Sequence, residues 1–174
     1  CEIVTQGKMA HSAYPELGHS AIDDLLDCLE KIRQIPLPED TLLGRSTLNI
    51  GTVSGGHAPN VVPDAARAEI MFRLVGDPAP IREGLARAAA GCGEVKEILY
   101  VPALHLAAIE GLPTTVVSYT TDVPFLRGAW GKPFLIGPGS IHLAHTLEER
   151  VPKRQLAEAV EIYKWMVRSL SAAS

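Results

Sequence analysis

The sequence lacks two features that would point to a nucleic acid or a membrane as a partner. Its 16 lysine and arginine residues are outnumbered by 20 aspartate and glutamate residues, which gives a net charge of -4, and no basic run stands out. Nucleic-acid binding normally requires a basic patch or stripe. No apolar stretch approaches the roughly 18 to 20 residues that span a bilayer. We therefore expect no nucleic-acid partner and no membrane partner.

Cysteine is also scarce. The three cysteines, Cys1, Cys28 and Cys92, are odd in number and widely spaced. This spacing predicts neither a disulfide framework nor a Cys-x-x-Cys metal site, and it favours the reducing cytoplasm as the location. The sequence has no signal peptide and no initiator methionine, and it opens on Cys1 inside an expected strand. We therefore expect a piece of a longer protein.

Two catalytic motifs are missing as well. No Gly-x-Ser-x-Gly segment is present, so a serine hydrolase of that type has no support. Gly-Lys-Ser/Thr follows neither of the glycine-rich stretches, 55–56 and 137–139, so neither matches a phosphate-binding loop. Both stretches are interpreted first as turns.

The composition is that of a folded protein. Hydrophobic residues make up 47% and charged residues 21%, close to the averages for globular domains. A length of 174 residues suits one ordinary domain or two small ones. The chain can therefore bury a hydrophobic core, and disorder is not expected.

The first part of the chain shows the pattern of an α+β fold. The clearest strand is 65–75, where Ala66, Ala68, Ile70, Phe72 and Leu74 alternate with mostly polar residues. Further strands are predicted at 1–11, 46–56 and 95–101, and helices at about 20–34 and 77–90. The order strand-helix-strand-strand-helix-strand predicts a ferredoxin-like βαββαβ domain, one antiparallel sheet with both helices on one face. It ends near Pro102.

The pattern of apolar and polar residues changes from about Leu112. Short buried strands are predicted at 114–119 and 133–139, with a helical turn in 121–130 between them. The final helix, 153–170, is predicted to turn its apolar stripe inward. The residues of that stripe are Leu156, Val160, Tyr163, Val167 and Leu170. Two strands and one helix form only part of an α/β sheet. We therefore expect Val116, Val117, Leu135 and Ile136 to face a missing neighbour and to promote association.

The segment "GPGSIHLAHTLEERV", 137–151, holds the most suggestive histidines. His142 and His145 lie three residues apart in a loop after an expected buried strand, with Glu148 and Glu149 close behind. Ligand residues of open α/β folds gather at such strand ends. Because His-x-x-His in a loop is a weak zinc signal, two ordinary surface histidines remain the alternative from spacing alone.

Other candidates have ordinary alternatives too. From position alone, His11, His19 and His57 are more simply read as loop histidines without a role. Asn60 follows glycines as turn formers often do, and Arg73 lies on the polar face of its strand.

Taken together, four blocks carry a resemblance. They are "GKMAHSAYPELGHSAI", "TLNIGTVSGGHAPNVVPDAARAEIMFR", "TDVPFL" and "GPGSIHLAHTLEERV". In order and spacing they resemble the dinuclear-zinc aminoacylase and carboxypeptidase family, which includes acetylornithine deacetylase, succinyl-diaminopimelate desuccinylase and carboxypeptidase G. The resemblance implies a lid domain at 1–108 that forms homodimers. It also implies that 109–174 is the C-terminal segment of an α/β zinc-hydrolase catalytic domain.

The resemblance also implies roles for six residues. His145 matches the last zinc ligand, and His11 matches the lid histidine that reaches the partner subunit's active site and polarises the scissile carbonyl. Asn60 and Arg73 match substrate-binding lid residues, and Gly137 and Gly139 lie in the glycine loop that lines the pocket. His19, His57, His105 and His142 match no functional position of the family.

The family's other zinc ligands and its glutamate base are not found in this sequence. We therefore expect two zinc ions in the intact parent, none tightly bound to this chain alone, and no activity of the chain by itself. The implied parent is a cytoplasmic zinc-dependent amidohydrolase that cleaves N-acyl amino acids or similar small amides, most like a deacetylase of amino-acid metabolism. The alternative for the isolated chain is a non-catalytic dimerisation module.

Overall fold

A computed structural model describes residues 1–119, 121–126 and 131–172. The chain divides into two compact units, which we describe separately. Unit 1 consists of Cys1–Leu104 and Val116–Thr121, and unit 2 consists of His105–Thr115 and Asp122–Ser174. Within the described part of the chain, no helix is both long and apolar enough to cross a membrane.

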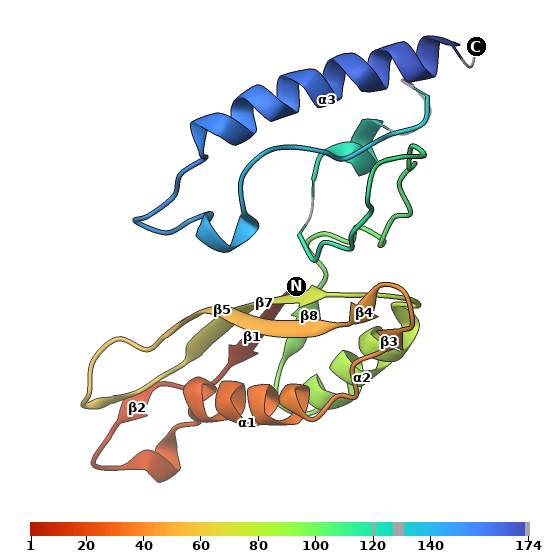
Figure 1. Cartoon of the computed structure of the whole chain (residues 1–174). Helices are drawn as coiled ribbons and strands as arrows, with labels where there is room; N and C mark the ends of the chain where they lie inside the picture. The colour runs from red at the N-terminus through yellow and green to blue at the C-terminus, as the bar shows by residue number, and fades with distance from the viewer. Residues whose placement is uncertain (120, 127–130, 173–174) are drawn as a thin grey trace. The chain divides into compact units, whose positions relative to one another are not determined.

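Unit 1 is built on a four-stranded antiparallel sheet, visible in Figure 1. Its strands are β1 (Glu2–Gln6), β5 (Thr47–Gly55), β7 (Ala65–Arg73) and β8 (Glu94–Lys96), in the spatial order β5-β7-β1-β8. Two helices pack on one face of the sheet, α1 (Ala21–Arg33) and α2 (Ala79–Ala89). The predicted βαββαβ order and the ferredoxin-like fold are thus confirmed. The last strand is shorter than predicted, because pairing with β1 ends at Lys96.

The core of unit 1 lies between the sheet and the helices. The alternation of β7 places Ala66, Ala68 and Ile70 inward, where each is at most 4% exposed. Helix α1 contributes Leu25, Cys28, Leu29 and Ile32 at helical spacing. Ser20 begins that helix, since its side chain accepts a hydrogen bond from the Asp23 N–H at 3.2 Å.

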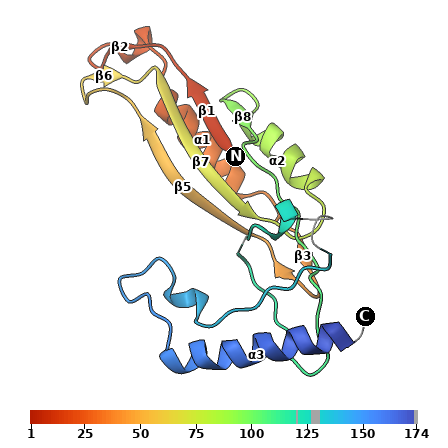
Figure 2. The ribbon, with the colours of Figure 1, turned by 90° about the horizontal axis from the view of Figure 1, so that it is seen from above.

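Two connections of unit 1, from β1 to α1 and from β5 to β7, extend beyond the sheet and pair as a narrow two-stranded ribbon. Strand β2 (Ala10–His11) pairs antiparallel with β6 (Val61–Val62), next to the 3-10 turn η1 (Pro15–Leu17). A second small ribbon joins β3 (Glu39–Asp40) to β4 (Gly44–Arg45). Figure 2 shows the two ribbons at opposite ends of the long β5–β7 hairpin, with β2 and β6 at one end and β3 at the other.

The cysteine prediction is wrong. Cys28 and Cys92 form a disulfide bond, with their Cα atoms 6.3 Å apart and 64 residues between them in sequence. A wide spacing in the sequence does not exclude a disulfide bond, because folding can bring distant cysteines together. Here helix α2 packs beside α1, and its end lies next to α1. Cys1 is the free cysteine.

Unit 2 has less regular structure than predicted. Its described residues form two 3-10 turns, η2 (Val123–Leu126) and η3 (Ile141–Leu143), and one long helix, α3 (Lys153–Ala172). The final helix and the turn at 123–126 confirm their predictions, although 127–130 lie outside the described residues. The described parts of 114–119 and 133–139 form no strand. A strand requires a ladder of hydrogen bonds to a neighbouring strand, and the described residues form no such ladder with these segments, although the Ala107 N–H donates to the Pro133 carbonyl oxygen at 2.9 Å.

The inward face predicted for α3 is also wrong. Ala159 and Met166 are the buried residues of the helix, at 8% and 9% exposed. The predicted stripe lies on an adjacent face and is 40% to 65% exposed, at Leu156, Val160, Tyr163, Val167 and Leu170. Val116, Val117, Leu135 and Ile136 are exposed as well, as predicted. The neighbour that would cover them remains a prediction.

Candidate functional site

The ribbon β2–β6 brings two candidate residues together. His11 lies opposite Val61 in the pairing of β2 with β6, and Asn60 directly precedes β6. The Ser12 N–H donates a hydrogen bond to the Asn60 carbonyl oxygen at 3.0 Å. Both side chains belong to exposed residues. Residues 49 positions apart in sequence thus share one exposed end of unit 1, a proximity that spacing alone could not show.

The backbone fixes the hydrogen-bonding role of the His11 ring. The Ala13 N–H donates to Nδ1 of His11 at 3.1 Å. A ring nitrogen that accepts a hydrogen bond carries no proton, so the proton of the neutral imidazole lies on Nε2. The His11 side chain can therefore donate one hydrogen bond from Nε2 to an oxygen atom outside unit 1.

Arg73 ends strand β7 on the face opposite to the helices. Its Nη1 donates to the Ser118 carbonyl oxygen at 2.9 Å, and the contact is exposed. A guanidinium has five N–H donors in a planar fork, so most of them stay available for a carboxylate. Sequence reading missed Ser118, and no local signal could have revealed a partner 45 residues away.

Arg73 lies far from the other two candidates within one chain. It is the last residue of β7, whereas Asn60 precedes Ala65, the first residue of that strand. Eight residues of extended chain separate Ala65 from Arg73, which corresponds to about 26 Å. An amino-acid-sized molecule cannot contact His11, Asn60 and Arg73 of a single chain at once.

The loop 137–151 is held by its own polar groups. The Gly139 N–H donates to Oε1 of Gln155 at 2.9 Å, and Gly139 has a φ of 98°. Serine 140 begins η3, because its Oγ accepts from the His142 N–H at 3.3 Å. A side chain at Gly139 would be strained by this φ, and its Cβ would lie 3.2 Å from Cγ2 of Val151. At Gly137, by contrast, no heavy atom of the described residues beyond its two chain neighbours would lie within 4 Å of a Cβ.

His145 occupies an unusual backbone conformation in the same loop. Its φ of 63° makes it the one described non-glycine residue with a positive φ. The His145 N–H donates to Oε2 of Glu149 at 2.9 Å, which offsets part of the conformational cost. Non-glycine residues in the left-handed region are uncommon and gather at functional sites.

The described residues do not form a metal site by themselves. Nowhere in residues 1–119, 121–126 and 131–172 do three His, Cys, Asp or Glu residues lie together in a way that could hold a metal ion. Catalytic zinc normally takes three protein ligands and keeps one open position. These residues alone therefore do not fit a complete zinc site, and we derive no chemical step through a metal.

Two of the histidines without a predicted role have structural partners. Nε2 of His19 lies 2.6 Å from Oδ2 of Asp24, and Nε2 of His57 lies 2.9 Å from Oδ1 of Asp64. In sequence, one pair follows β2 and the other flanks β6. His142, like His145, is exposed.

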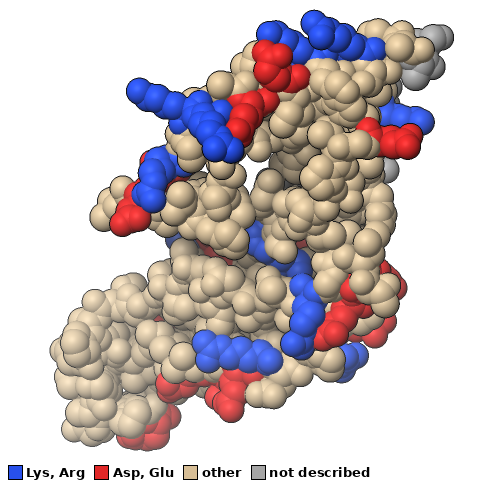
Figure 3. All heavy atoms as spheres, in the orientation of Figure 1, with Lys and Arg blue, Asp and Glu red and all other residues tan. Residues whose placement is uncertain are grey.

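On the face shown in Figure 3, basic and acidic side chains lie beside one another along the surface. The ion pairs of unit 1 include that of Arg82 with Glu97, at 2.7 Å. This hydrogen-bonded guanidinium lowers the pKa of Glu97 below its ordinary value of 4.5.

The fold thus defines a ferredoxin-like α+β domain, joined in the same chain to a second unit that ends in a long helix. Residues 1–87 match the model of the M20 peptidase dimerisation domain, and the chain belongs to this family.

The curated relatives that match carry names of the same kind. A Schizosaccharomyces pombe protein named "Peptidase M20 domain-containing protein" is 41% identical over 169 residues, which cover 95% of this chain and 42% of that protein. A "Probable carboxypeptidase" of Aspergillus niger is 40% identical over 187 residues, which cover 96% of this chain and 45% of that protein. The chain thus spans less than half the length of these two relatives.

Among solved structures, an aminobenzoyl-glutamate utilization protein from Klebsiella pneumoniae aligns with a TM-score of 0.45 and 24% identity. The match covers 52% of this chain and 23% of that one. The aminopeptidase PepT from Bacillus cereus aligns with a TM-score of 0.40 and 26% identity, over 52% of this chain and 25% of that one.

Proposed function

We propose that the polypeptide containing these residues is a metal-dependent hydrolase that cleaves the amide bond of small N-acyl amino acids. The residue at the C-terminal end of a peptide is itself an N-acyl amino acid with a free carboxylate. Deacylase chemistry and the carboxypeptidase activity named for the relatives therefore share one substrate pattern. The observation that supports this proposal most is the His11–Asn60 pair on an exposed ribbon, with Nε2 of His11 fixed as a donor.

His11 would stabilise the charge that develops on the carbonyl oxygen during attack on the amide. Its Nε2–H can donate to that oxygen, and its Nδ1 is held by the Ala13 N–H. Because the backbone already orients this donor, little conformational freedom is lost when it binds. Stabilisation of an oxyanion requires such preorganised donors. The Asn60 side chain would donate and accept beside it, at the acyl part of the substrate.

Arg73 would bind the substrate carboxylate. Its planar fork matches two carboxylate oxygens, and one of its five N–H groups already orients it through Ser118. His145 would supply one zinc ligand, and Gly137 and Gly139 would line the pocket. The remaining zinc ligands and the base would come from residues outside 1–174.

The proposal also includes a homodimer, in which the lid domains of two chains pair along strand β5. This strand is nine residues long and lies at one edge of the sheet, whereas β8 at the other edge has three residues. Leu26 of α1 and Val53 of β5 are 55% and 57% exposed. Helix α1 contacts β5, so these two apolar side chains lie beside the outer edge of that strand. Along this edge, the backbone N–H and C=O groups of β5 have no neighbouring strand within the described sheet.

The dimer is tested by Leu26→Asp with Val53→Lys in the full-length protein. We expect the molar mass measured by light scattering to fall from that of two chains to that of one. Leu42→Asp is the matched control, because Leu42 is 62% exposed in the β3–β4 turn. A mass that the double variant leaves unchanged would argue against pairing at this edge.

The reaction is tested with N-acyl amino acids and dipeptides, each beside its C-terminal amide. We expect hydrolysis of the acids, loss of activity with a chelator, and at least tenfold lower kcat/KM for the amides. The variant Arg73→Ala should raise KM for the acids and remove this discrimination. Equal rates on acids and amides would contradict a carboxylate clamp. A dimer that hydrolyses neither would favour the alternative, a non-catalytic dimerisation module.

A further inference from the structure

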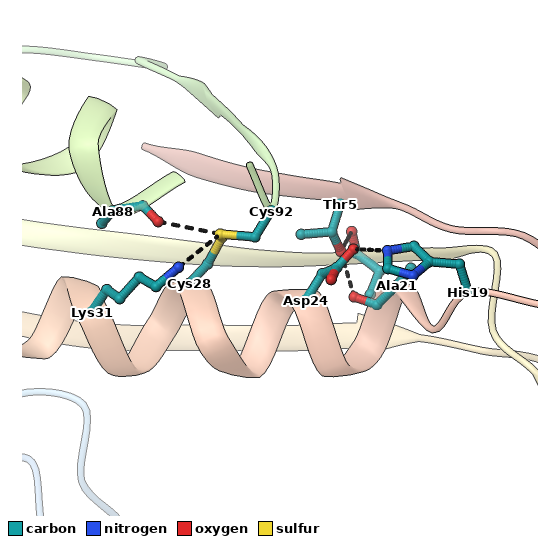
Figure 4. The surroundings of a disulfide bond; sticks show 9 residues. Thr5, His19, Ala21, Asp24, Cys28, Lys31, Ala88 and Cys92 are labelled. Carbon is teal, nitrogen blue, oxygen red and sulfur yellow. Dashed lines mark hydrogen bonds and ion pairs between the residues drawn. A yellow bond between two sulfur atoms is a disulfide. The ribbon is translucent and has the colours of Figure 1, made fainter. Parts of the chain in front are cut away.

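Helix α1 and the end of α2 are joined in the core of unit 1 by the Cys28–Cys92 bond (Figure 4). We propose that these two cysteines are an oxidative modification site at which the lid is cross-linked during maturation in a thiol-oxidising compartment, with Cys92 as the sulfur that reacts first.

The backbone around Cys92 places this residue over Cys28. Helix α2 ends at Ala89, and Gly91 then adopts a φ of 82°, which turns the chain back toward α1. The Cys92 N–H donates to the Ala89 carbonyl oxygen at 3.0 Å. At Gly93 a Cβ would lie 2.8 Å from the Val4 carbonyl oxygen, so the chain passes directly against β1. Local geometry, rather than the bond alone, therefore brings the two sulfurs together.

The two sulfurs differ in accessibility. Cys28 is 0% exposed and packs in the core, whereas Cys92 is only partly buried. Nζ of Lys31 lies 3.8 Å from Sγ of Cys92, and the Ala88 carbonyl oxygen lies 3.2 Å from the same sulfur. Figure 4 shows both contacts at Cys92. The ammonium group favours the negative thiolate there, and the carbonyl can accept from the neutral thiol.

This asymmetry assigns the order of the exchange. The Cys92 thiolate attacks a low-molecular-weight disulfide such as oxidised glutathione, forms a mixed disulfide and releases one glutathione thiolate. Cys28 then passes its proton, through water, to the released glutathione thiolate, and its sulfur attacks Sγ of Cys92 and displaces the second glutathione thiolate, which takes up the proton that Cys92 had given to the solvent. Overall two thiols are oxidised, one glutathione disulfide is reduced to two thiols, and the electrons balance.

The bond also points to the compartment. A cross-link over 64 residues removes much of the freedom of the unfolded chain, so its loss lowers stability substantially. Such bonds persist where thiols are kept oxidised and are rare in the cytosol. The structure therefore favours an oxidising compartment over the cytoplasm expected from cysteine spacing. This inference does not depend on the proposed enzymatic activity.

The first test counts thiols in the protein purified without reductant and unfolded before labelling. Of the three cysteines in residues 1–174, we expect only Cys1 to react, and all three after reduction; peptide mapping should join Cys28 to Cys92. Reduction should lower Tm by on the order of 10 °C. Three reactive thiols, or a bond that includes Cys1, would overturn the proposal.

The second test uses single variants in a Cys1→Ser background and adds oxidised glutathione to the folded, reduced protein. Cys28→Ser should trap one glutathione on Cys92, because no resolving thiol remains. Cys92→Ser should react at least tenfold more slowly, because Cys28 is buried. Equal rates in the two variants would refute the assigned order even if both fold normally.

Discussion

At the scale of single residues, small backbone contacts decide what the candidate side chains can do. His11 became a defined donor because the Ala13 N–H occupies its Nδ1. Arg73 is oriented by a carbonyl oxygen 45 residues away. These contacts depend on the folded backbone, so the sequence could offer the residue types but not their hydrogen-bonding roles.

The role of His11 can be checked directly in the full-length protein. We expect His11→Ala to lower kcat by about 10² to 10³, because one preorganised oxyanion donor is lost. KM should change little, since the donor acts mainly on charge that develops in the transition state. His57→Ala, at the same end of unit 1, is the control and should retain activity. A change confined to KM would show a binding role instead.

The Arg82–Glu97 pair gives a pH prediction. Arg82 donates through Nε and Nη2 to the two carboxylate oxygens of Glu97, at 2.7 and 2.8 Å, and so lowers the pKa of Glu97. A depressed folded-state pKa adds stability above pH 4.5 that is lost as the pH falls through the folded value. We expect the Tm difference between the wild type and Glu97→Gln to be small, because the pair is exposed, and to vanish at low pH. A difference that grows on acidification would contradict this sign.

At the scale of elements, hydrophobic periodicity predicted the buried positions of unit 1 correctly, but it failed to predict those of helix α3 in unit 2. The alternation of β7 and the helical spacing of α1 placed the core correctly, since burial in a two-layer fold follows those periods. In unit 2, the stripe of α3 was assigned inward although the described residues bury Ala159 and Met166 instead. An apolar stripe indicates that a helix face packs against a neighbouring element, but it does not show that this neighbour belongs to the same segment of chain.

The core of unit 1 can be probed at Leu25 of α1, which is 1% exposed. Replacement by alanine should lower the free energy of unfolding by about 3 to 5 kcal/mol, the range for leucine truncation in a packed core. Chemical denaturation would measure this loss. Leu42→Ala is the control, because its exposed side chain should change stability by no more than about 0.5 kcal/mol. Similar losses in both variants would contradict the assigned core.

At the scale of the whole molecule, the long β5–β7 hairpin separates the candidate residues. His11 and Asn60 lie beyond one end and Arg73 lies at the other, about 26 Å away along β7. If the proposed homodimer forms, each active site must combine His11 of one chain with Arg73 of the other. The resemblance assigned His11 to the partner subunit's active site and Arg73 to substrate binding, and the length of the hairpin adds that the two residues of one chain serve different sites.

This arrangement predicts complementation between two inactive variants. His11→Ala and Arg73→Ala should each be nearly inactive alone. After mixing, unfolding and refolding at equal amounts, half of the dimers contain one chain of each kind, and each of these has one intact site. About a quarter of wild-type activity should therefore return. No recovery, with mixed dimers verified by mass, would show that both residues act within one chain.

The sequence by itself determined the order of strands and helices in unit 1, its core positions and the family resemblance, because alternation, helical spacing and turn residues are local properties. Only the tertiary structure decided the Cys28–Cys92 bond, the meeting of His11 with Asn60, and the distance of Arg73 from both. These features relate residues 13 to 64 positions apart, and whether such residues lie near one another or far apart depends on how the sheet and helices are arranged rather than on any local pattern.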